Sequence, residues 1–240
     1  WMDAKTYGIA ATPRNGKVVE INSLWYNGLM IMADLAEKFE EQPNTKKYKE
    51  LARKCKKSFN AKFYNSKRKC LYDVITDEKN KDGKIRPNQL FALSLTHPIV
   101  EPNSIEANNI INVVEKKLLN NYGLKTLAKG EPNYVDIYEG DAFKRDMSYH
   151  QGITWTWLLE LYYEAFKNMV KFEKRKTYKT KLETKLKDFV EKEKQVFEKE
   201  INQRGCVGSI AEIYDSTKPY EPKGAIAQAW SVGAICTMIL

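Results

Sequence analysis

The chain has 240 residues, of which 42% are hydrophobic and 30% charged, with a net charge of +9. This composition is typical of a globular domain and excludes a disordered chain, and no apolar run reaches the roughly 20 residues that span a bilayer. Most of the positive charge is lysine, whereas a nucleic-acid surface more often gathers arginine and aromatic residues on one face. We therefore expect partners other than nucleic acid and membranes.

Helical periodicity predicts the elements of the first half. Apolar residues at helical spacing indicate helices at about 20–41, 45–64, 90–97 and 103–120. The first helix is expected to bury one apolar stripe, formed by Ile21, Leu24, Trp25, Leu29, Met32 and Leu35. Strand signals are limited to Cys70–Ile75 and the vicinity of Ile137.

Three more helices are predicted in the second half, at about 148–168, at 174–200 and from 224 onwards. A segment at 122–145, which is rich in Gly, Pro, Asp and Tyr and typical of a loop, separates them from the four helices of the first half. About seven helices joined by uneven loops predict an all-α fold, with residues 1–240 in a single domain.

The cysteines and the short motifs narrow the chemistry. Cys55, Cys70, Cys206 and Cys236 have no metal-ligand spacing and are typical of reduced thiols in a cytoplasmic protein, although two disulfides fit the spacing as well. Phosphate-binding, dinucleotide-binding and nucleophile-elbow motifs do not occur. We expect neither a metal ion nor a cofactor.

The stretch from Arg145 to Leu159 concentrates aromatic and hydrogen-bonding side chains. It contains Asp146, Tyr149, His150, Gln151, Trp155 and Trp157. Flat aromatic faces beside hydrogen-bonding groups suit a sugar ring, which has an apolar face and a rim of hydroxyls. The alternative is the start of an amphipathic helix whose core residues are Trp155, Leu158, Leu159 and Tyr162.

Two carboxylates stand in unusual surroundings. Asp3 precedes a loop that contains Gly, Pro and Arg, and Glu212 follows a glycine-rich approach. Glycoside hydrolysis needs two carboxyl groups beside the scissile bond, one as acid and the other as base or nucleophile. The alternative for each is a local cap or ion pair.

Other polar residues have a structural and a binding interpretation. Glu20 begins an apolar helix, where it can favour the helix dipole or hold a sugar hydroxyl. Arg86, Asn88 and Gln89 offer a guanidinium and two amides before a helix, where Asn88 can also act as a cap.

Eight segments occur in a fixed order along the chain. They are Trp1-Met2-Asp3-Ala4, Ala11-Thr12-Pro13-Arg14-Asn15-Gly16, Val19-Glu20-Ile21-Asn22-Ser23-Leu24-Trp25-Tyr26-Asn27, Arg86-Pro87-Asn88-Gln89, Tyr122-Gly123-Leu124-Lys125-Thr126-Leu127, Tyr149-His150-Gln151-Gly152, Gly208-Ser209-Ile210-Ala211-Glu212-Ile213 and Ala227-Gln228-Ala229-Trp230-Ser231. Taken together, they resemble one family, the C-terminal amylo-α-1,6-glucosidase domain of glycogen debranching enzymes, which is a glucoamylase-like module. The resemblance covers nearly the whole chain.

The resemblance implies an (α/α)6 toroid that releases glucose from the α-1,6 branch points of a trimmed glycogen or limit dextrin by inversion. It implies Asp3 as general acid and Glu212 as general base, with carboxyl groups about 6.5–9.5 Å apart. The implied stacking residues are Trp1, Trp25, Trp155, Trp157 and Trp230, and the implied hydroxyl-binding residues are Glu20, Arg86, Asn88, Gln89, Asp146, Tyr149, His150 and Gln151.

Fewer helices are predicted than a complete toroid contains. The chain is therefore expected to be the C-terminal part of the domain, with further helices of the same polypeptide preceding Trp1. Apolar surface left by their absence would favour homo-oligomers, and the isolated fragment is expected to be inactive or weakly active. The alternatives are another toroidal α-glucosidase, glucoamylase-like or trehalase-like, and a carbohydrate-binding fragment without catalysis.

Overall fold

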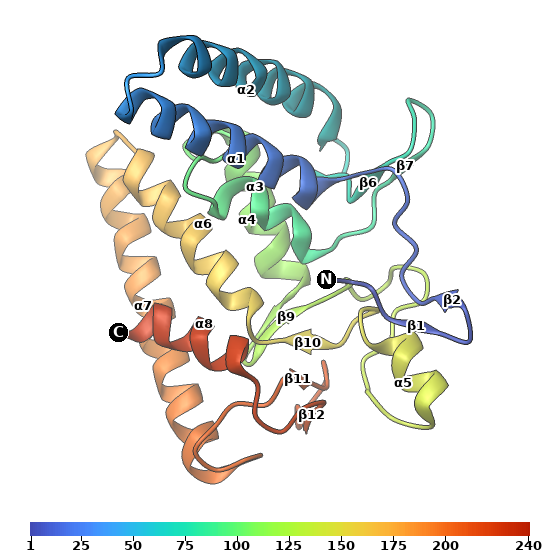
Figure 1. Ribbon diagram of the computed structural model, residues 1–240. Coiled ribbons are helices and arrows are strands. Elements are labelled where there is room, and N and C mark those ends of the chain that lie inside the picture. Colours follow the sequence, from blue (N-terminus) through green and yellow to red (C-terminus); the bar gives the residue numbers. More distant parts are fainter.

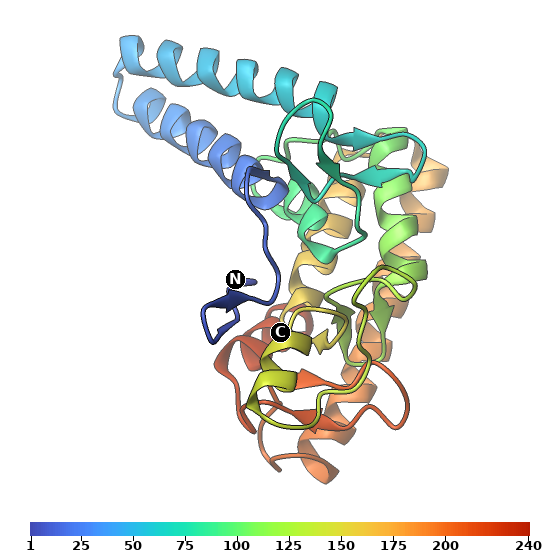
Figure 2. The same cartoon turned by 90° about the vertical axis from the view of Figure 1, so that its right-hand side faces the viewer.

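The structure is a computed structural model that describes residues 1–240. Its first two helices, α1 (Val19–Lys38) and α2 (Gln42–Phe63), pack against each other as a helical hairpin (Figure 1). In the turned view this hairpin extends to one side of the other helices (Figure 2). No helix is both long and apolar enough to cross a membrane.

Helix α6 (Leu158–Phe172) packs against η1 (Pro87–Leu90, a 3-10 helix), α3 (Phe91–Ser94), α7 (Lys176–Gln203) and α8 (Ala229–Ile239). Helix α4 (Ile105–Lys117) packs against η1, whereas α5 (Ala142–Ser148) lies apart from α6 (Figure 1). Side-chain caps define two helix starts, since Ser104 accepts from the backbone N–H of Ala107 and Asp141 from that of Lys144.

Short antiparallel strands connect the helices. A five-stranded sheet has the order β12-β11-β10-β9-β8 and joins segments from the middle and the end of the chain. Its strands are β8 (Leu119–Asn120), β9 (Gly123–Lys125), β10 (Thr154–Trp155), β11 (Ile213–Tyr214) and β12 (Pro222–Lys223). In its register Trp155 lies opposite Ile213, so the sheet brings the residue after Glu212 beside the aromatic stretch.

Three smaller sheets complete the strands. The pair β1–β2 (Lys5–Thr6, Ile9–Ala10) forms a hairpin, and β4 (Tyr64–Asn65) pairs with β5 (Cys70–Leu71). The third sheet has the order β3-β6-β7 and consists of Lys17–Val18, Val74–Ile75 and Lys81–Asp82. The predicted strand at 70–75 is thus present as β5 and β6, whereas Ile137 belongs to no strand and that prediction is wrong.

Several predicted helices and loops differ from the structure in their bounds. The helix expected at 148–168 begins only at Leu158, because the preceding residues form a turn at Gly152 and strand β10. Gly152 has a φ of +137°, and a Cβ there would lie 2.1 Å from the carbonyl oxygen of Val135. The segment expected to be a loop at 122–145 contains most of α5, which begins after the capping residue Asp141. The chain is mainly helical, with eight α-helices against about seven predicted.

The stripe predicted for α1 is largely on the outside. Of its six members only Leu29 is buried, while Trp25 is 59% exposed. The helix instead buries Val19, Tyr26, Leu29 and small residues against its neighbours. Periodicity alone indicated the wrong face because α1 is apolar around most of its circumference.

The core prediction for α6 is confirmed, since Leu158, Leu159 and Tyr162 are buried in one continuous cluster. All four cysteines are free.

Candidate active site

The two predicted catalytic carboxylates come from opposite ends of the chain. Asp3 is exposed in the extended segment before β1. Glu212 is half-buried directly before β11 and accepts hydrogen bonds from the chain that follows β12. The backbone N–H of Ala225 donates to its Oε2 at 3.0 Å, and Gln228 Nε2 donates to its Oε1 at 3.4 Å. Asp3 is thus open to solvent, whereas Glu212 is held in one orientation.

Tyr149 lies beside Glu212 and within the electrostatic influence of Asp3. Burial raises the pKa of Tyr149, and a hydrogen bond with Glu212 and the charges of Glu212, Tyr138 and Asp3 raise this pKa further. Trp1, two residues before Asp3, packs against Trp155, and Trp155 lies opposite Ile213, which directly follows Glu212. The fold has thus brought the two ends of the chain to one place. This convergence is what a two-carboxylate site requires.

Three tryptophans form a wall beside Tyr149. The Trp1 ring meets the Trp157 ring edge-on at 5.0 Å, and Trp157 stacks on Trp230 with ring centroids 5.3 Å apart. Trp230 is 40% exposed, so this wall presents an aromatic surface to solvent. Such surfaces suit the apolar face of a sugar ring.

Trp155 lies beneath this wall. It is 2% exposed, donates through Nε1 to the carbonyl of Tyr149 at 3.0 Å, and is covered by Trp1 and Trp230. Its ring therefore supports the wall instead of forming its surface, as the amphipathic-helix interpretation implied.

His150 is also buried in this layer. Its ring stacks on Trp155 with centroids 5.0 Å apart, and Trp1 packs edge-on against it. Burial lowers the pKa of His150 to about 3, although the charge of Asp3 acts in the opposite direction. The imidazole is thus neutral at physiological pH and is unsuited to act as a proton donor there.

A buried polar layer holds the N-terminal segment in place. Asn88 is fully buried, accepts from Trp1 Nε1 at 2.8 Å and donates to Asp73 Oδ1 at 3.0 Å. Arg86 donates to the carbonyl of His150 at 2.7 Å and to Gln151 Oε1 at 2.8 Å. These side chains fix the orientation of Trp1 and of the 149–151 turn.

Gln151 and Gln89 have their amides engaged by the chain itself. Gln151 Nε2 donates to the carbonyl of Ala11 at 2.7 Å. Gln89 accepts from the backbone N–H of Leu71 and donates to the carbonyl of Arg86, so it braces the turn before α3. Both residues act first as structural links.

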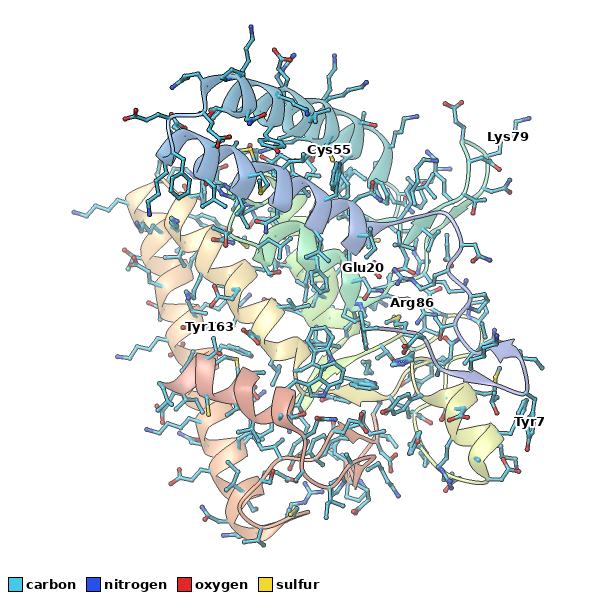
Figure 3. The ribbon with its side chains drawn as sticks, in the orientation of Figure 1. Tyr7, Glu20, Cys55, Lys79, Arg86 and Tyr163 are labelled. Carbon is cyan, nitrogen blue, oxygen red and sulfur yellow. The ribbon has the colours of Figure 1, made fainter.

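Arg14 is a member of this layer that sequence reasoning did not single out. Its guanidinium makes paired hydrogen bonds with Glu20 and with Asp73, and all three side chains are nearly buried. Figure 3 shows Glu20 and Arg86 close together near the start of α1. Glu20 is therefore part of an ion-pair network in which both its oxygens are engaged. The Pro13-Arg14-Asn15-Gly16 loop was the only signal in the sequence.

Asp146 and Trp25, two of the predicted binding residues, lie outside the buried polar layer and the tryptophan wall. Asp146 is half-buried on α5, where its charge raises the pKa of Tyr138 after the larger effects of burial and of Arg145. Trp25 lines a cavity of about 890 Å³ between α1, α2 and the β3-β6-β7 sheet. Neither Asp3 nor Glu212 lines this cavity.

Gly224 and Gln228 also belong to the site, although the sequence did not single them out. Both lie around the Glu212 carboxylate, and Gln228 was present in the Ala227–Ser231 segment only as a neighbour of Trp230. Their contacts depend on the pairing of β11 with β12, which no local pattern predicts.

Comparisons with known proteins agree with this geometry. A model of the family described as amylo-alpha-1,6-glucosidase matches residues 1–237. The chain is 26% identical to the glycogen debranching enzyme of Saccharomyces cerevisiae over an alignment that covers 69% of this chain and 13% of that protein. The chain therefore spans a small part of this curated relative.

Two solved structures share the fold. Neutral trehalase Nth1 from Saccharomyces cerevisiae matches 98% of this chain and 40% of its own, with a TM-score of 0.66 and 16% identity. A GH63 mannosylglycerate hydrolase from Thermus thermophilus, in complex with glucose, matches 92% of this chain and 44% of its own, with a TM-score of 0.59 and 14% identity. These likenesses are consistent with part of an α/α toroid.

Proposed function

The chain belongs to the amylo-alpha-1,6-glucosidase family of glycoside hydrolases, and from this premise we propose that it hydrolyses the α-1,6-linked glucose at branch points of a trimmed α-glucan such as limit dextrin. The observation that supports the proposal is the approach of the two chain ends at a tryptophan wall. Trp1, two residues before Asp3, packs against Trp155 and Trp157, and Trp155 lies opposite Ile213, the residue after Glu212. The proposed reaction proceeds with inversion, as a general acid and a general base acting together require.

Glu212 is the proposed general base. A base must keep a fixed lone-pair direction toward the attacking water, and the donors from Ala225 and Gln228 supply that orientation. The carboxylate takes a proton from water as the water oxygen attacks the anomeric carbon, and the glycosidic bond breaks on the opposite face of the ring.

Asp3 is the proposed general acid, which protonates the departing glycosidic oxygen. Its exposure allows a bulky glucan leaving group to approach it. Trp1, Trp157 and Trp230 are proposed to stack on the bound glucose, and Tyr149 and Asp146 to bind its hydroxyls. A set of buried side chains is proposed to hold these contacting groups in position. They are Glu20, Arg86, Asn88, Gln89, His150 and Gln151.

The two carboxylate roles are separable with α-glucosyl fluoride, whose leaving group needs no protonation. In the full-length natural protein, Asp3→Asn should abolish hydrolysis of limit dextrin but retain much of the fluoride hydrolysis. Glu212→Gln should abolish both, because water activation is needed for either substrate. Proton NMR should show β-glucose as the first product.

Several outcomes would redirect the proposal. A variant that keeps its limit-dextrin rate within about tenfold of the wild type, a barrier change of only ~1.4 kcal/mol, would remove that carboxylate from its role. Faster hydrolysis of maltose-type substrates or trehalose than of limit dextrin would indicate a different α-glucosidase. Glycogen binding that persists in the double variant, without any hydrolysis by the wild type, would indicate a binding module.

A further inference from the structure

An exposed aromatic pair lies on the elements that flank the candidate site. Tyr7 is 86% exposed at the turn of the β1–β2 hairpin, and its ring stacks on Phe143 of α5 with centroids 6.0 Å apart and an interplanar angle of 26°. Figure 3 shows Tyr7 at the outer end of this hairpin, next to α5. Phe143 is itself 38% exposed, so the pair forms a surface and belongs to no core.

The backbone at this turn is unfavourable for tyrosine. Tyr7 has a φ of 45° and Gly8 a φ of 80°, so both central residues of the two-residue turn are left-handed. Such turns favour Asn, Asp or Gly, because a Cβ is strained in this region. A large ring placed there gains little burial in return, so neither turn geometry nor core packing accounts for Tyr7.

Both aromatic residues are tied to the site by short segments. Tyr7 follows Asp3 by four residues, a distance of at most about 14 Å along an extended chain. Phe143 shares α5 with Asp146, and Tyr149 directly follows that helix. Strand β1 packs against α5, so these two elements form one rim of the site on the side of Asp3.

The chemistry of the reaction decides which part of the substrate lies on that rim. A general acid stands beside the departing oxygen, so the glucan that carries the branch leaves on the side of Asp3. A glucan chain on this side passes over the hairpin and α5. Sugar rings stack on exposed aromatic side chains through their apolar C–H faces.

We propose that Tyr7 and Phe143 form a platform that binds the glucan main chain on the leaving-group side of Asp3. This inference rests on the proposed function, because it takes Asp3 as the acid. The platform distinguishes a long glucan from a small glucoside, since only the former reaches beyond the glucose pocket.

The test compares Tyr7→Asn and Phe143→Ala with the wild type in the full-length natural protein. Asparagine suits the left-handed turn, so Tyr7→Asn removes the ring without straining the hairpin. The ratio of the KM for limit dextrin to the KM for α-glucosyl fluoride should rise about fivefold in either variant. Phe39→Ala is the matched control, because Phe39 is 69% exposed at the end of α1 and far along the chain from the site.

An unchanged ratio would overturn the platform, and so would equal losses on both substrates, which would indicate a structural effect on Asp3. Binding to limit dextrin, measured by affinity electrophoresis in a Glu212→Gln background, judges the platform independently of turnover. If the wild type hydrolyses neither substrate, the proposed function fails. Weaker dextrin binding by Tyr7→Asn would then still support the platform, and unchanged binding would refute it.

Discussion

Gly224 makes room for the carboxylate of Glu212. A Cβ at Gly224 would lie 2.4 Å from Glu212 Oε2, closer than real Cβ atoms approach their neighbours, and 3.0 Å from Ile213. Gly224 also has a φ of +71°, which suits glycine. The chain leaving β12 therefore passes so close to Glu212 that a larger residue at Gly224 would push the carboxylate aside, and the neighbouring backbone N–H of Ala225 can reach the carboxylate.

Gly224→Ala is expected to displace Glu212 and lower the rate of α-glucosyl fluoride hydrolysis about a hundredfold, since misplaced catalytic groups lose that much. Gly130→Ala is the matched control, because Gly130 has a φ of +94° but nothing within 4 Å of its added Cβ. Both variants carry the same kind of backbone strain, so thermal unfolding should shift similarly in both. Equal activity in the two variants would contradict a steric role for Gly224.

The buried imidazole of His150 predicts a pH-dependent stability. Its pKa is lowered from 6.5 to about 3 by burial, so below pH 6.5 the unfolded chain binds a proton that the folded chain does not. Its contribution to stability is thus present above pH 6.5 and is lost by about 1.4 kcal/mol per pH unit as the pH falls toward 3. Urea unfolding should show the stability gap between wild type and His150→Gln narrowing over this range. A constant gap would show that His150 titrates normally.

Glu193 predicts a pH dependence of stability opposite to that of His150. This carboxyl is fully buried on α7, and burial raises its pKa from 4.5 to about 7, although the ammonium of Lys192, 3.5 Å from Oε1, acts in the opposite direction. Its contribution is fully present below pH 4.5 and is lost as the pH rises through 7, by about 3 kcal/mol in total.

Glu193→Gln should therefore become more stable relative to the wild type between pH 4 and pH 8, as measured by urea unfolding. The exposed Glu191 on the same helix provides the control variant Glu191→Gln, which should change little. Because Glu193 and His150 act in opposite directions between pH 4.5 and 6.5, only difference curves against the wild type separate them. Parallel curves for Glu193→Gln and Glu191→Gln would contradict the assignment.

The two faces of α1 predict unequal costs for the same substitution. Leu29 is 4% exposed within the core cluster, whereas Leu35 is 42% exposed. Leu29→Ala should lower the free energy of unfolding by about 2–5 kcal/mol, and Leu35→Ala should change it by about 0.5 kcal/mol or less. Chemical denaturation measures both. A large loss of stability for Leu35→Ala would show that the exposed face of α1 is covered by a contact beyond those made within residues 1–240.

Local patterns in the sequence were enough to predict the long helices and much of the site's composition. Helices α1, α2 and α7 follow from periodicity that extends over many turns, which neighbouring segments do not override. The ordered motifs predicted the family of the chain, and they pointed to Asp3, Glu212 and Tyr149 as candidate site residues. Both kinds of signal depend only on spacing along the chain.

Packing between distant segments determines which of these residues reach the surface of the site and which support it. Trp155 and Asn88 are covered because Trp1, far from both along the chain, packs over them. Arg14 joins Glu20 to Asp73, and Gly224 approaches Glu212, through pairings that only the folded chain makes. Burial and these pairings arise from contacts between remote parts of the chain, and no local spacing records them.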